Sequence, residues 1–174
     1  MKRYRTGGPP RTRRRTRLSA GLRGSDDIGS KGEMKPVLVV AGVIIENGRV
    51  LITQRRKGDR HGLLWEFPGG KVKEEEEPRE GLKRELKEEL DIEVKVGRLL
   101  RVVYHTYPEY SILLLVYGCR MERGVPKPLE CSDLRWVRPM ELGSFDMSPA
   151  DAPIREDLRS HFETASFTAG TDRR

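Results

Sequence analysis

The 174-residue sequence lacks the features that mark secreted and membrane-spanning proteins. It has only two cysteines, Cys119 and Cys131, too few for a disulfide framework, so we expect reduced thiols and a cytoplasmic location. The longest apolar run, residues 112–117, has the length of a strand and cannot cross a bilayer. The basic start has no apolar segment of the kind that a secretory signal needs. Three histidines are present, and they do not form a metal-binding set.

The net charge of +7 is concentrated at the N-terminus. Residues 1–33 hold ten Lys or Arg and three acids, whereas the rest of the chain holds 24 of each and is neutral. Because this segment has almost no large apolar residues, it cannot offset the entropy of ordering, and we expect it to be disordered. Three interpretations stay open: translated upstream sequence before a true start at Met34, a basic arm that binds nucleic-acid phosphates, or a targeting peptide.

The neutral part of the chain has the length of a single domain, which we place at residues 34–164, followed by a disordered tail at 165–174. Runs of β-branched residues predict strands, and Asn47-Gly48 predicts a tight hairpin between the first two. The strands are expected at 37–45, 49–54, 93–107, 110–117 and 134–137, and a closing helix at 151–162.

The most informative stretch is residues 69–92, GGKVKEEEEPREGLKRELKEELDI. Pro78 suits the first turn of a helix, and leucines at four-residue spacing predict a buried stripe along it. Three glutamates stand at i, i+3 and i+4 and share one face beside that stripe: Glu85, Glu88 and Glu89. Such a row of acids is commonly a solvated surface. Beside a buried stripe and after a Gly-Gly loop, it also suits hard divalent cations, which bind carboxylates and bridge them to phosphates.

The spacing of this stretch resembles the Nudix box, G-x5-E-x7-R-E-U-x-E-E-x-G-U, in which U is an apolar residue. The matching residues are Gly70, Glu76, Arg84, Glu85, Leu86, Glu88, Glu89 and Ile92. The one departure is Asp91, which stands where the family has glycine. Asp tolerates the left-handed turn that a helix end often needs, less readily than Gly. The preceding run WEFPGGK resembles the MutT-type branch, which acts on nucleoside triphosphates, and the likeness covers residues 35–163.

The resemblance implies an α/β fold, the α/β/α sandwich in which a mixed sheet lies between helices. It also implies metal-dependent hydrolysis of a nucleoside triphosphate to a nucleoside monophosphate and pyrophosphate. The implied cofactor is Mg²⁺, with Mn²⁺ as the other candidate, and Arg84 is expected to orient the carboxylates. The implied metal ligands are the Gly70 carbonyl, Glu85, Glu88, Glu89 and Glu130, the last as ligand or base; the alternative for Glu130 is a plain loop carboxylate.

Four residues outside the box are candidates for substrate binding. Arg55 and His61 flank a basic loop, which is either solvated or a clamp on phosphates, and the resemblance makes Arg55 the phosphate contact. Phe67 is expected near the base pocket or in the core. Asp151 stands where the best-known 8-oxoguanine enzymes have Asn, unless it serves only as a helix N-cap.

The chemistry of Asp151 bears on the substrate. Asn donates and accepts, which suits the O6 acceptor and the N7–H donor of 8-oxoguanine, whereas an ionised Asp only accepts, which suits the amino group of cytosine. A protonated Asp would act like Asn if its pKa were raised. We therefore expect an enzyme that removes oxidised nucleotides such as 8-oxo-dGTP. The alternatives are a pyrophosphohydrolase for (d)CTP or 5-methyl-dCTP and, in another class, a nucleic-acid-binding protein that uses residues 1–33. No membrane partner is expected, and the oligomeric state stays open.

Overall fold

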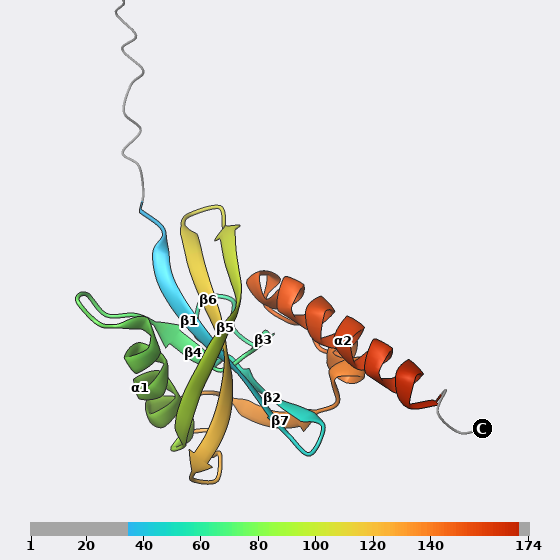
Figure 1. Cartoon of the computed structure of the whole chain (residues 1–174). Helices are drawn as coiled ribbons and strands as arrows, with labels where there is room; N and C mark the ends of the chain where they lie inside the picture. The colour runs from blue at the N-terminus through green and yellow to red at the C-terminus, as the bar shows by residue number, and fades with distance from the viewer. Residues whose placement is uncertain (1–34, 171–174) are drawn as a thin grey trace, which may run out of the picture. The chain divides into compact units, whose positions relative to one another are not determined.

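The structure, a computed structural model, describes residues 35–170, so the interpretations of residues 1–33 and of Met34 lie outside the described part of the chain. Seven strands form one mixed sheet of order β3-β2-β1-β6-β5, with β4 paired to β1 and β7 to β2 (Figure 1). Strands β1 and β6 are parallel, and the other pairs are antiparallel. The strands are β1 (Val37–Glu46), β2 (Arg49–Gln54), β3 (Trp65–Glu66), β4 (Gly69–Lys71), β5 (Glu93–Thr106), β6 (Ser111–Arg123) and β7 (Asp133–Val137).

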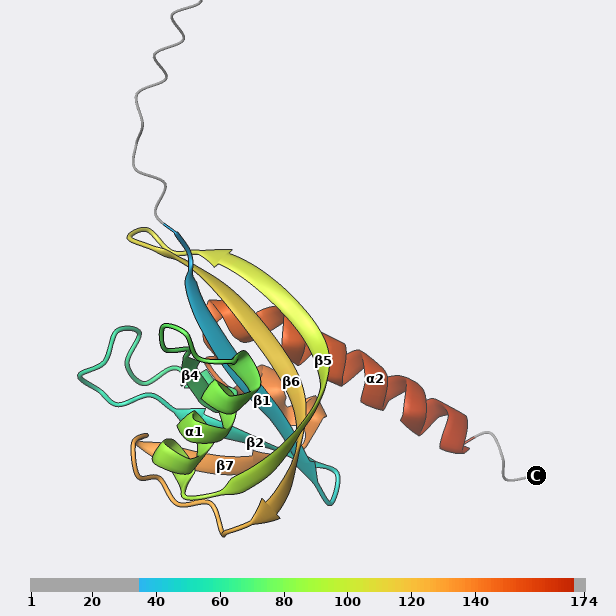
Figure 2. The same ribbon diagram turned by 60° about the vertical axis from the view of Figure 1, so that its left-hand side comes forward.

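Two helices cover the sheet from opposite sides. Helix α1 (Pro78–Leu90) lies on one face and helix α2 (Ala152–Gly170) on the other, as Figures 1 and 2 show. Two short 3-10 helices, η1 (Pro139–Ser144) and η2 (Pro149–Asp151), precede α2. The predicted α/β/α sandwich with a mixed sheet between helices is confirmed. In the described part of the chain, no helix is both long and apolar enough to cross a membrane.

Strand β1 runs through the middle of the sheet and contributes to a core on each face. Successive side chains of a strand point to opposite faces. Val40 and Ile44 are fully buried in the core that α1 covers, and Ala41 and Val43 are buried in the core on the α2 side. This double burial explains why the strand reads as a continuous apolar run instead of an alternating one.

The hairpin after β1 forms as predicted, because Asn47 and Gly48 both take the positive φ values that a tight turn needs. Strand β6 is longer than predicted and continues to Arg123, because its pairing with β5 extends to that residue. Strands β3 and β4 were not predicted, since runs of two and three residues are too short to show a period. Helix α2 includes residues 165–170, which the sequence analysis assigns to the tail.

Candidate active site

Helix α1 begins and ends where its sequence dictates. The side chain of Glu77 caps its N-terminus by accepting hydrogen bonds from the backbone N–H groups of Arg79 and Glu80, and Pro78 occupies the first turn. The predicted leucine stripe is fully buried against the sheet: Leu82, Leu86 and Leu90. Burial of a leucine side chain contributes about 2 kcal/mol to stability. The stripe therefore fixes which face of the helix packs against the sheet, and with it the positions of the glutamates beside that face.

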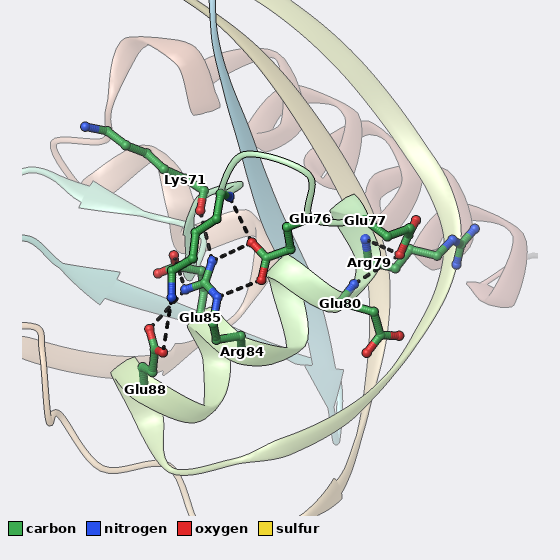
Figure 3. A network of polar contacts seen from close by, with 9 residues as sticks. Lys71, Glu76, Glu77, Arg79, Glu80, Arg84, Glu85 and Glu88 are labelled. Carbon is green, nitrogen blue, oxygen red and sulfur yellow. Dashed lines mark hydrogen bonds and ion pairs between the residues drawn. The ribbon is translucent and has the colours of Figure 1, made fainter.

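Arg84 is the centre of a network of carboxylates on α1 and on the loop that precedes it (Figure 3). It donates two hydrogen bonds of 2.8 Å to Glu76, one of 2.7 Å to Glu85 and one of 3.0 Å to Glu88. A further hydrogen bond of 3.1 Å reaches the Lys71 carbonyl on β4. These bonds lower the pKa of Glu76 to about 2 and raise the pKa of Arg84. Arg84 therefore orients the glutamates and ties them to the Gly-Gly loop.

The glycines of that loop allow it to lie against β1 and α1. Gly69 has φ 155, and a Cβ on it would overlap the Val40 carbonyl. A Cβ on Gly70 would overlap the carboxylate of Glu85, which lies directly above it. The Gly69 N–H donates a hydrogen bond of 3.3 Å to Glu89. The Gly70 backbone thus lies next to the acids with which the sequence analysis groups it.

Glu89 differs from the other two glutamates of the row because it is buried. Burial raises its pKa to about 7, and the nearby charges of Glu66 and Glu85 act in the same direction. Glu88 is instead exposed, and its contacts are with Arg84 and, at 4.0 Å, with Lys73. The three predicted ligands on α1 therefore have distinct environments: Glu89 is buried, Glu85 is bonded to Arg84, and Glu88 is exposed to solvent.

A cavity of about 260 Å³ joins these acids to residues far away in the sequence. Glu85, Glu89, Gly70 and Glu130 line one end of it, while Glu88 is not among its lining residues. The other substrate candidates of the sequence analysis line the same cavity: Arg55, His61, Phe67 and Asp151. The cavity thus brings together all of the predicted site residues except Arg84 and Glu88. Glu88 is bonded to Arg84 at the exposed side of that network.

Arg55 and Glu66 form the middle of the cavity wall. The guanidinium donates to Glu66 at 2.7 Å and to the Arg60 carbonyl at 2.9 Å, which fixes its plane. Burial raises the pKa of Glu66, and the charge of Arg55 opposes that shift. Glu66 was not singled out from the sequence, although it lies in the WEFPGG run; only the fold brings it to Arg55 and near Glu89.

Aromatic side chains form another part of the cavity lining. Phe67 is buried there, so it serves both the core and the pocket, and its N–H donates a hydrogen bond of 3.4 Å to Asp151. The rings of His61 and Tyr107 lie 4.6 Å apart, and Tyr107 stacks on Tyr110 at 4.9 Å. Both tyrosines line the cavity. Both were predicted at strand ends, and no motif distinguished them.

The acidity of Asp151, which lines the cavity, is strongly altered. Burial raises its pKa to about 8, and the charge of Glu66 raises it further, against the hydrogen bond from Phe67. Its carboxyl group faces the cavity, although the residue directly precedes α2 as predicted. A carboxyl group of this pKa is largely protonated at pH 7, so it donates as well as accepts.

The donor set suits a hard divalent cation. Carboxylate and carbonyl oxygens are the ligands that Mg²⁺ prefers, and the cavity gathers three glutamates and the Gly70 backbone at one end. Burial and the charges of Glu66 and Glu85 raise the pKa of Glu89, and a bound cation would oppose this shift by favouring the ionised carboxylate. In the conformation of residues 35–170, no three acidic, Cys or His side chains converge at metal-binding distance, because Glu85 is turned to Arg84 and Glu89 to Gly69.

Comparison with known proteins agrees with this geometry. Residues 40–157 match the model of the NUDIX domain family. The chain is 36% identical to CTP pyrophosphohydrolase of Escherichia coli over 71% of its length and 91% of that protein. It is 40% identical to 8-oxo-dGTP diphosphatase of Buchnera aphidicola over 72% of its length and 95% of that protein. Among solved structures, the E. coli ORF135 protein superimposes with a TM-score of 0.65 at 34% identity, covering 79% of this chain and 97% of that one.

The acids around Arg84 have the arrangement that the Nudix box predicts, and the chain belongs to the Nudix hydrolase family. It is MutT-like, since a solved structure of a MutT protein from Methanosarcina mazei superimposes with a TM-score of 0.64 at 25% identity, covering 77% of this chain and 97% of that one. The resemblance drawn from residues 69–92 is therefore confirmed.

Proposed function

We propose that this protein hydrolyses nucleoside triphosphates to nucleoside monophosphates and pyrophosphate with the help of a divalent cation, Mg²⁺ or Mn²⁺. The observation that carries the proposal is the cavity whose lining includes both acids of α1 and aromatic side chains. One end suits a metal-bound phosphate chain and the other suits a flat base. When bound, the cation would neutralise phosphate charge and lower the pKa of an attacking water.

Each residue has a role that follows from its contacts. Glu85, Glu89, Glu130 and the Gly70 carbonyl would hold the cation beside the phosphates, with Glu88 at the outer edge. Arg84 keeps Glu85 and Glu88 in place through its hydrogen bonds. Arg55, fixed in its plane by Glu66, would present its free N–H groups to phosphate oxygens.

The aromatic end would receive the base. His61 supports this role because, within residues 35–170, its buried Nε2 atom has no hydrogen-bond partner, leaving it available to a ligand. Phe67 and Tyr107 would enclose the base, and Asp151 would bond to its edge.

We propose 8-oxo-dGTP as the preferred substrate. With its pKa raised to about 8, the Asp151 carboxyl is mostly protonated at pH 7. Its O–H would donate to O6 of 8-oxoguanine, and its carbonyl oxygen would accept from N7–H. The biological role would be removal of oxidised nucleotides before a polymerase uses them. A cytoplasmic location would fit both this role and the two free cysteines.

A second substrate is favoured by a specific observation. The ionised form of Asp151 only accepts hydrogen bonds, which suits the N4 amino group of CTP, dCTP or 5-methyl-dCTP. One relative, 36% identical, is named CTP pyrophosphohydrolase. The two substrates would thus be served by two protonation states of one residue.

The test is pyrophosphate release from a panel of nucleotides that includes 8-oxo-dGTP and CTP, with and without Mg²⁺. We expect release that requires the cation and is strongly reduced in Glu88→Gln and Glu85→Gln. Absence of release from every nucleotide, together with variants that behave like the parent, would contradict the enzymatic role.

A further inference from the structure

The loop that carries Glu130 caps the C-terminal end of helix α1. The last carbonyl groups of a helix lack partners within the helix. Here the N–H of Lys127 donates to the Leu90 carbonyl at 3.0 Å, and the N–H groups of Leu129 and Glu130 donate to the Glu89 carbonyl at 3.0 and 3.2 Å. The position of Glu130 relative to Glu89, with which it shares the cavity wall, is therefore set by how this loop docks on the helix.

Asp91 stands at the junction of that helix and the next strand. It has φ 58 and ψ 34, a left-handed conformation that glycine adopts with less strain. Its carboxylate forms two ion pairs: one of 2.6 Å with Lys87, one turn back on α1, and one of 3.2 Å with Lys127 on the loop. The second ion pair adds a side-chain link between the helix end and the loop to the backbone hydrogen bonds.

The same loop is held from its other side by Arg56, which donates a hydrogen bond of 2.9 Å to the Leu129 carbonyl. Its beginning also lies close to Asp91, since a Cβ on Gly124 would come within 2.5 Å of the Asp91 carbonyl oxygen. Residues 127–130 are thus held from both sides. Of these contacts with the loop, the Asp91–Lys127 ion pair is the one that a glycine at position 91 would lack.

We propose that Asp91 and Lys127 are positioning residues, whose ion pair holds the 127–130 loop so that Glu130 stays beside Glu89. The assignment of Glu130 and Glu89 to metal binding rests on the proposed function. Compared with glycine, the Asp at the one mismatched position of the Nudix box has a more strained backbone. In return, its side chain orders the loop that carries Glu130.

The informative variant is Asp91→Gly, because the two roles of Asp91 predict opposite results. Glycine relaxes the left-handed backbone, so the melting temperature should be unchanged or higher. Loss of the ion pair should speed amide hydrogen exchange at Leu129 and Glu130, measured without metal, by about twofold to fivefold, the range expected for exposed ion pairs. The Mg²⁺ concentration that gives half-maximal CTP or 8-oxo-dGTP hydrolysis should rise by a similar factor, about twofold to fivefold.

Two further variants test the pair itself. Lys127→Met should give the same changes in amide exchange and Mg²⁺ dependence as Asp91→Gly, without the gain from the relaxed backbone, and in these two measurements the double variant should be no worse than either. Lys127→Arg should keep the parental exchange rates. Lys87→Met is the matched control, because it removes the other partner of Asp91 without touching the loop, and it should leave exchange at Leu129 unchanged.

Unchanged exchange and unchanged Mg²⁺ dependence in Asp91→Gly would show that Asp91 only ends the helix, and the proposal would be overturned. The exchange measurement separates this failure from failure of the proposed function, because it reads the loop whether or not the protein hydrolyses any nucleotide.

Discussion

At the metal end of the cavity, Glu85, Glu89 and Gly70 all come from residues 69–92, whereas at the base end Phe67 bonds to Asp151 from 84 positions away. The metal end is polar, and its glutamates are tied together by Arg84. The base end is buried, and its acid is destabilised in the charged form. Apart from Glu130, the proposed metal ligands thus come from one local stretch, whereas the proposed contacts to the base depend on tertiary structure.

The largest effect is expected at the metal end. Glu85→Gln keeps the shape of the side chain but removes a charge from the cavity, so kcat/KM should fall about a hundredfold or more for every nucleotide. Steady-state pyrophosphate release at saturating Mg²⁺ would measure it. Glu80→Gln, an exposed acid on the same helix paired only with Lys83 among the described residues, should leave kcat/KM unchanged. A fall in kcat/KM confined to nucleotides with one base would contradict the proposal that Glu85 acts on the phosphates and not on base selection.

The next effect concerns the base end and its pH dependence. As pH rises from 7 to 9, Asp151 passes its pKa of about 8 and changes from mostly neutral to mostly ionised. The neutral form should favour 8-oxo-dGTP and the ionised form CTP. The ratio of kcat/KM for 8-oxo-dGTP to that for CTP should therefore fall about a hundredfold over this interval, because the neutral fraction falls about tenfold while the ionised fraction rises about tenfold.

Asp151→Asn isolates that residue, since Asn donates and accepts at all pH values. In this variant the ratio should stay near its pH 7 value throughout. Asp157→Asn, an exposed acid on α2 that bonds to Arg101, is the matched control and should keep the parental pH dependence. If both variants behaved alike, Asp151 would have no part in choosing the base.

The smallest effect is expected where the two ends meet. Arg55→Lys retains the charge beside Glu66 but loses the planar fork that suits phosphate oxygens. We expect KM to rise about fivefold for 8-oxo-dGTP and CTP alike, with little change in kcat. Arg49→Lys, at the exposed start of the strand β2 that Arg55 follows, serves as the control. A change in the 8-oxo-dGTP to CTP ratio would mean that Arg55 also contacts the base.

Residues 69–92 show how far sequence patterns reach. The leucine spacing predicted the buried face of α1, and the acid spacing placed the carboxylates beside it, because helix geometry fixes both. Even here, Glu88 and Glu89 were grouped on one face, whereas the structure buries Glu89 and leaves Glu88 exposed. Successive residues of a helix lie about 100° apart, and Glu89 is the one next to the buried leucines. The role of Glu76 as the bidentate partner of Arg84 also required the folded loop.

Sequence by itself determined the family, the α/β/α architecture and the acid-bearing helix, because periodicity and a long motif are local properties. Only the tertiary structure decided the acidity of Asp151, the pairing of Arg55 with Glu66 and the tyrosines that line the base end. Those properties depend on burial and on charges brought together from distant segments, and a pKa responds to distances in space and not to distances along the chain.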